Sequence, residues 1–170
     1  MRMSAAELGD NLAQLVWESF SDFIERRGLG SEEGGEDGGT AVLVLPTVEP
    51  EEALIFFMWL HTRACQQACA DPECVKRVLD AMHRAIYEDL EARTFTRVQL
   101  PLFEQRVSVR YTEYYDAASD RSGEKVVEVA ARHVLVNGMP RPAVVLELAE
   151  AATVTSGPLR DFLEDIELTD

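Results

Sequence analysis

Residues 53–60 are Ala-Leu-Ile-Phe-Phe-Met-Trp-Leu, an unbroken apolar run of eight residues. Pro50, followed by Glu51 and Glu52, is typical of a helix start, because proline needs no backbone partner there and carboxylates favour the positive end of the helix dipole. A helix that is apolar on every face has to be enclosed by its own domain or shared with a partner subunit. We therefore expect a central helix over 50–70, with Trp59 buried.

The segments on either side of this run carry clear helix signals. Ser4 and Glu7 have the spacing of a capping box, and the apolar stripe that follows predicts a helix over 4–27. Asp71-Pro72 is typical of a helix N-cap followed by the first helical position, and it predicts a helix over 72–92. Because so short a turn joins this helix to the apolar one, we expect the two to pack as an antiparallel hairpin.

The second half of the chain mixes helix and strand signals. Residues 94–119 carry both a helical stripe and a strand-like alternation, and we favour a helix from about Pro101. In residues 124–136, valines that prefer strands alternate with good helix formers, so both structures stay open. Residues 40–45 form a short β-prone segment.

Two further helices are expected near the C-terminus. One opens at residues 140–142, and the other is introduced by Ser156-Gly157-Pro158. The sequence as a whole predicts a mostly α-helical, bundle-like single domain over 1–170, with about five to seven helices and at most minor β content.

The charge balance narrows the choice of partners. The chain has 31 Asp and Glu against 16 Lys and Arg, a formal net charge of −15. Nucleic acids and anionic membrane surfaces would repel such a chain, so we expect neither as a partner. The longest apolar run is far below the roughly 20 residues of a membrane span. Three closely spaced cysteines suggest reduced thiols, and we expect a cytoplasmic protein.

Residues 28–39 contain six glycines and four acidic residues. A segment with one apolar side chain has almost nothing to bury, so it is expected to form a flexible acidic loop.

Six side chains on neighbouring predicted helices are candidate metal ligands: His61, Cys65, Cys69, Cys74, Asp80 and His83. Thiolates and imidazoles suit zinc or a cuprous ion. Three ligands at four-residue steps span roughly 12 Å along a helix, however, which is too far for one ion to take every member. Asp80 and His83 resemble one half of a di-metal site in a helical bundle, but the second half is missing. Since free cysteine is commonly a small core residue, we favour the interpretation without a metal.

A cluster of polar aromatic and charged residues is the candidate for ligand binding: Arg110, Tyr111, Glu113 and Tyr114. Phenols, a carboxylate and a guanidinium together can orient a polar molecule between helices. The alternative is that the tyrosine rings pack in the core and keep their hydroxyls at its wet edge, and we favour it.

The sequence contains no glycine-rich dinucleotide loop, no phosphate-binding loop and no Gly-x-Ser-x-Gly nucleophile motif, so we predict neither catalysis nor a cofactor. The leading hypothesis is a protein-interaction or regulatory domain acting as a homodimer, because the all-round apolar helix has more surface than a one-sided stripe needs. A small-molecule-binding domain and a metal-binding protein are the alternatives. The competing explanation for the apolar helix is that helices from residues 100–166 cover it within one chain.

Deletion of residues 30–38 is expected to leave the fold intact, because loop closure depends weakly on loop length and the segment buries almost nothing. Thermal unfolding of the shortened chain checks this. A melting midpoint lowered by more than about 4 °C, the shift that about 1–2 kcal/mol produces, would contradict it.

Overall fold

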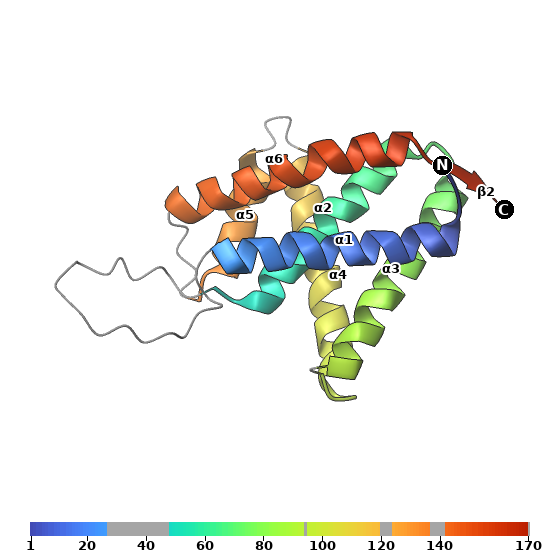
Figure 1. Cartoon of the computed structure of the whole chain (residues 1–170). Helices are drawn as coiled ribbons and strands as arrows, with labels where there is room; N and C mark the ends of the chain where they lie inside the picture. The colour runs from blue at the N-terminus through green and yellow to red at the C-terminus, as the bar shows by residue number, and fades with distance from the viewer. Residues whose placement is uncertain (27–47, 94, 120–123, 137–141, 170) are drawn as a thin grey trace, which may run out of the picture.

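The computed structural model describes residues 1–26, 48–93, 95–119, 124–136 and 142–169, and over these residues it contains six helices and two short strands (Figure 1). In chain order these are β1 (Arg2–Ser4), α1 (Ala5–Arg26), α2 (Pro50–Ala68), α3 (Pro72–Arg93), α4 (Gln99–Ala118), α5 (Glu124–Val134), α6 (Pro142–Glu164) and β2 (Glu167–Thr169). The predicted mostly α-helical domain is confirmed. The predicted loop at 28–39 and the β-prone segment at 40–45 lie outside the described residues.

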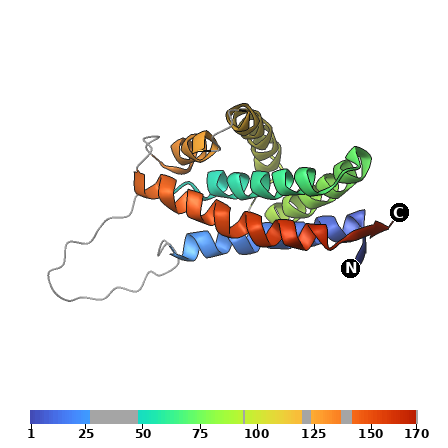
Figure 2. The same cartoon turned by 90° about the horizontal axis from the view of Figure 1, so that it is seen from above.

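Helix α2 lies in the middle of the molecule. Seen from above, α1 and α6 lie on one side of it and α4 and α5 on the other (Figure 2). Every residue from 52 to 62 is buried. Trp59 is 5% exposed, and its ring contacts those of Tyr114 and Tyr115 at centroid distances of 5.6 and 5.9 Å. Helices of the same chain thus enclose the apolar run, which needs no partner subunit to cover it.

Helix α3 packs mainly along α1, so the expected hairpin with α2 is only a small part of its packing. Gly9 explains the close approach of α1 to α3. A Cβ atom at position 9 would lie 2.4 Å from the Cβ of Ala81 and 2.7 Å from the carbonyl oxygen of Val78. Only glycine leaves room for the two helices to meet this closely.

The two ends of the chain are joined at one end of the molecule. The predicted capping box is present, because Ser4 N–H donates to Glu7 Oε2 at 2.8 Å and Glu7 N–H donates to Ser4 Oγ at 3.2 Å. Next to it, β1 pairs in parallel with β2, and Glu167 N–H donates to the Met1 carbonyl oxygen at 2.8 Å. Strands of three residues are too short to leave a pattern in the sequence, which explains why they were not predicted.

The ambiguous second half of the chain is helical. Helix α4 begins at Gln99, close to the expected start, and residues 124–134 form α5. Val126, Ala130 and Val134 are buried at four-residue steps, so a helix places all three against the core. Burial of this face outweighs the strand preference of the valines.

The expectation of two separate C-terminal helices was wrong. Helix α6 runs without a break through Pro158, although proline removes a backbone hydrogen bond there. Buried Leu148 and Leu159 lie on either side of the Ser-Gly-Pro segment, and α6 packs along α2. Docking along α2 therefore outweighs the local stop signal.

We expect Gly9→Ala to destabilise the protein by about 1–3 kcal/mol or more, because the added methyl group overpacks the contact between α1 and α3. The matched control is Gly157→Ala, where an added Cβ has no neighbour within 4 Å. There the better helix propensity of alanine is offset by its position before Pro158, and we expect a change below about 1 kcal/mol. Urea unfolding measures both. Equal stabilities for the two variants would contradict the close approach.

Candidate functional site

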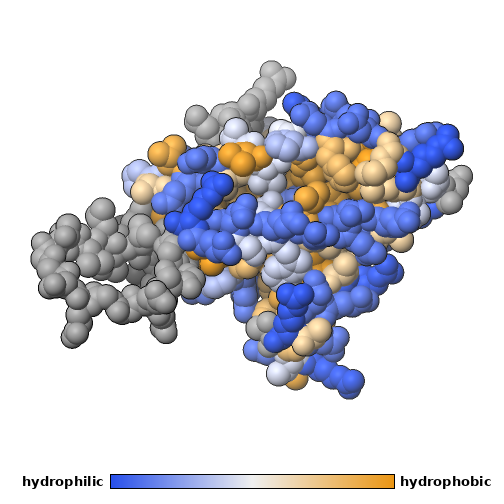
Figure 3. Space-filling model, in the orientation of Figure 1, coloured by the Kyte–Doolittle hydropathy of each residue, from blue (hydrophilic) through white to orange (hydrophobic). Residues whose placement is uncertain are grey.

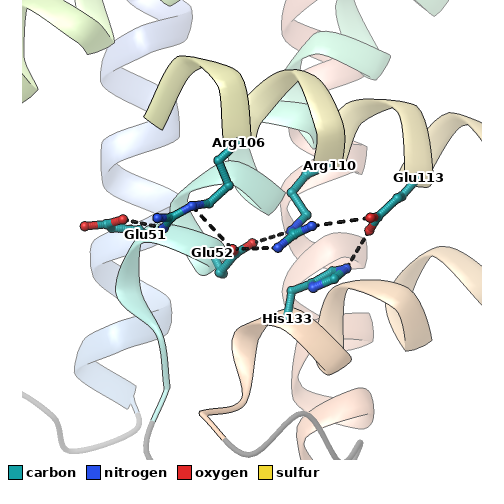
Figure 4. Close-up of polar contacts among 6 residues, drawn as sticks. All are labelled: Glu51, Glu52, Arg106, Arg110, Glu113 and His133. Atoms are coloured by element: carbon teal, nitrogen blue, oxygen red, sulfur yellow. Dashed lines mark hydrogen bonds and ion pairs between the residues drawn. The ribbon is translucent and has the colours of Figure 1, made fainter. Parts of the chain in front are cut away.

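A chain of charged side chains ties α2, α4 and α5 together (Figure 4). Its centre is Glu52, which is 7% exposed and accepts two hydrogen bonds from Arg110. Arg110 Nε lies 2.8 Å from Glu52 Oε2, and the second guanidinium nitrogen, Nη2, lies 3.0 Å from Oε1. This is the two-pronged geometry in which guanidinium–carboxylate pairs are strongest.

The chain continues on both sides of this pair. Arg110 Nη1 donates to Glu113 Oε1 at 3.3 Å, and His133 Nε2 lies 2.5 Å from Glu113 Oε2. On the other side, Arg106 Nη1 donates to Glu51 Oε2 at 2.5 Å. The pKa of Arg110 is raised, first by its hydrogen bonds to Glu52. Arg110 and Glu113, two of the predicted ligand-binding residues, thus have partners within the protein and hold three helices together.

Tyr114 is fully buried, between the rings of Phe56 and Trp59. Its hydroxyl has no hydrogen-bond partner among the described residues, and burial raises its pKa. Its ring therefore packs in the core, as the favoured interpretation of the tyrosines expects, but its hydroxyl is buried and does not lie at the wet edge of the core.

Tyr111 links α4 to α2 and α3. Its hydroxyl lies 3.1 Å from Thr62 Oγ1 and 2.9 Å from His83 Nε2. His83 Nδ1 lies 2.7 Å from the Leu79 carbonyl oxygen, so Nδ1 carries the proton and Nε2 accepts from the tyrosine. Burial lowers the pKa of His83 and raises that of Tyr111. The structure thus pairs Tyr111, a candidate ligand-binding residue, with His83, a candidate metal ligand. The spacing of these residues in the sequence did not predict this contact.

The three thiols lie near the turn between α2 and α3. Cys65 is fully buried, and Cys69 follows it by four residues at the end of α2. Burial raises the pKa of Cys65 to about 12 and also raises that of Cys69. Thiols that stay protonated are weak nucleophiles and weak metal ligands.

The candidate metal ligands do not form one centre. Within the described ranges, no group of three or more His, Cys, Asp or Glu side chains is placed to hold a metal ion. Asp80 and His83 line a surface hollow together with Cys69 and Tyr111, whereas His61 lies at a different surface.

His61 lies at the floor of a groove between α1 and α6. The two helices run side by side over α2 but make few contacts with each other (Figures 1 and 2). The groove has a volume of about 660 Å³, and its floor is made by Phe23, Phe57, His61 and Leu159. Leu15 on α1 and Val154 and Phe162 on α6 form the apolar part of its walls. Figure 3 shows apolar surface between the two helices.

The rims of the groove are acidic. Among the described residues that line it, Glu18 and Asp22 on α1 and Glu150 on α6 are exposed, Glu147 on α6 is half-buried, and Arg26 is the one cationic side chain. The groove therefore combines an apolar floor with an excess of negative charge at its edges.

His61 places one polar atom at this floor. Its Nδ1 lies 2.8 Å from the Phe57 carbonyl oxygen, so Nδ1–H donates to it and Nε2 carries the lone pair. No described residue forms a hydrogen bond with Nε2. Burial lowers the pKa of His61 to about 4, and the ring is neutral at pH 7. His61 is thus a hydrogen-bond acceptor under an otherwise apolar groove.

Sequence reasoning missed the groove because its residues come from three helices far apart in the chain. No local signal in the sequence distinguishes its residues: Val154, which lines the groove, is 53% exposed, while Leu146 on the same helix is 70% exposed and does not line it. No described helix is long and apolar enough to cross a membrane.

No protein-family model, curated protein or solved structure matches this chain.

Removal of the Glu52 carboxylate is expected to destabilise the protein far more than removal of the Glu51 carboxylate. Glu52→Ala leaves the largely buried Arg110 guanidinium without its main partner, and such losses cost about 3–5 kcal/mol. Glu51→Ala, the matched control, breaks a half-exposed ion pair with Arg106 and is expected to cost less than about 1 kcal/mol. Chemical denaturation of both variants compares the costs. Similar losses would show that the pairing of Glu52 with Arg110 is not the main tie.

Proposed function

We propose that this protein is a non-catalytic protein-interaction domain and that the groove between α1 and α6 is its binding surface. The observation that carries the proposal is the apolar part of the groove's walls: Leu15, Val154 and Phe162 remain partly or fully exposed, whereas the stretch of α2 beneath them is buried. An apolar surface with polar rims is typical of a site that another molecule covers.

The other candidate sites support this choice by their internal pairing. Arg110 and Glu113 are held by Glu52 and His133, and Tyr111 is held by Thr62 and His83. Polar groups that are already satisfied have less to offer a ligand than the groove, where apolar wall surface is exposed and the Nε2 of His61 has no hydrogen-bond partner among the described residues.

Two further parts of the proposal concern assembly and location. A homodimer stays a prediction, although enclosure of α2 within one chain removes the main argument for it, and light scattering at moderate salt tests it. A cytoplasmic location is supported by three cysteines that are all free thiols.

Site-specific photo-crosslinking tests the binding surface. A benzophenone amino acid replaces either Val154 in the groove or Leu146, which is 70% exposed on the same helix but does not line the groove. In the cells that make the protein, we expect the probe at position 154 to form discrete protein adducts. We expect the probe at position 146 to form none of these same adducts.

Leu15→Glu on the opposite wall provides the second arm of this experiment. A charged side chain facing the apolar floor is expected to abolish the adducts from position 154, while circular dichroism confirms that the variant is folded. Adducts that are the same from both positions, or that persist in the Leu15 variant, would argue against the groove as the binding surface.

A further inference from the structure

Resting on the proposed function, we infer that the occupant of the groove is a cationic amphipathic helix of a partner protein, anchored by a tryptophan whose indole N–H donates to His61 Nε2. Three independent features of the groove lead to this class of partner: its length, the charge of its rims and the single acceptor at its floor.

The length of the groove fits a helix. Its lining residues on α1 run from Asn11 to Arg26. At 1.5 Å per residue, this wall is roughly 22 Å long, or about four helical turns. The walls are themselves two helices side by side, and an amphipathic helix laid between them completes a three-helix surface through contacts at three- and four-residue steps.

The negative charge of the rims favours a partner with positive charge. Among the described residues that line the groove, Glu18 and Asp22 on one side and Glu150 on the other are exposed carboxylates, against one arginine. The whole chain carries −15, so a second copy or an anionic lipid surface would be repelled. Lysines and arginines flanking the apolar stripe of a partner helix would lie against these exposed carboxylates.

The floor of the groove selects the anchor. The Nε2 of His61 is the polar atom there that lacks a hydrogen-bond partner among the described residues, and the neutral ring makes it an acceptor. A purely apolar side chain would cover this acceptor without satisfying it, which costs binding energy. Tryptophan combines a large apolar ring with a single donor and no acceptor, so it suits both the apolar walls of the groove and the Nε2 of His61.

Titration calorimetry with three synthetic peptides of about 18 residues tests the charge of the partner. All three share one apolar stripe with a central tryptophan, and their polar faces carry lysine, glutamine or glutamate. At an ionic strength of 0.1 M we expect the lysine peptide to bind at least about tenfold more tightly than the glutamine peptide, and the glutamate peptide not to bind. At 1 M, where the Debye length falls to about 3 Å, the preference should largely disappear.

Variants of the protein locate the binding. Val154→Glu should abolish binding of the lysine peptide, and Leu146→Glu should leave it unchanged. The double substitution Asp22→Lys with Glu150→Lys, at two exposed rim positions, should transfer the preference to the glutamate peptide. Binding that ignores Val154→Glu, or no binding of any peptide, would overturn the inference.

The outcomes separate this inference from the proposed function. Equal affinities for the lysine and glutamine peptides would overturn the charge selection, while loss of binding in Val154→Glu would still support the groove as a binding surface. If no peptide binds but discrete adducts form at position 154, the partner is not such a helix and the proposed function stands. If neither is seen, both fail.

A single-atom change tests the anchor. Replacing the peptide's tryptophan by benzothienylalanine exchanges the indole N–H for sulfur and keeps the shape of the ring. We expect the dissociation constant to rise about fivefold or more, because Nε2 is then covered without a donor. In the Val154→Glu protein the two peptides should not differ. An unchanged dissociation constant with the wild-type protein would overturn the role of His61.

Discussion

Helix α2 has to be covered on every side, and the arrangement of the other helices follows from this requirement. Three polar side chains lie within its buried stretch: Glu52, His61 and Thr62. Buried polar groups are costly unless they are paired, so each one restricts what can pack beside it. Glu52 and Thr62 are both paired from α4, through the adjacent residues Arg110 and Tyr111. These two contacts hold α4 across α2 in one register. Apolar packing alone would not select this register over others.

The elements that could be predicted are those whose signals are local. The capping box of Ser4 and Glu7, the proline at the start of α2 and the Asp71-Pro72 turn each act within one helical turn of the residues they affect. Gly9 shows why packing could not be predicted in the same way. In the sequence it is a residue of low helix propensity within a predicted helix. Its role, to leave room for Ala81, becomes clear only once α3 is placed opposite α1. The continuity of α6 through Pro158 likewise depends on α2, a helix distant in sequence.

The candidate site shows the same division between local chemistry and long-range placement. Spacing identified Arg110, Glu113 and His83 as polar groups on helices, but it could not show that each is already paired with a residue at least 20 positions away. His61 was grouped with the cysteines because it is four residues from Cys65, yet its environment is set by α1 and α6. Residue type can therefore be predicted from sequence, whereas the availability of a side chain depends on which helices lie beside it.

Both walls of the groove pack on α2, and each is held in place by further contacts. Helix α1 is fixed to α3 by the close approach at Gly9, and α6 is fixed along α2, with β2 pairing its end of the chain to β1. Movement of α1 toward α6 would separate α1 from α3 at the close approach of Gly9 to Ala81. Exposed carboxylates also line both walls, Glu18 and Asp22 on α1 and Glu150 on α6, and like charges oppose closure. A cationic partner would relieve this repulsion as it covers the apolar floor, so the charge that keeps the groove open in the free protein would also favour its occupant.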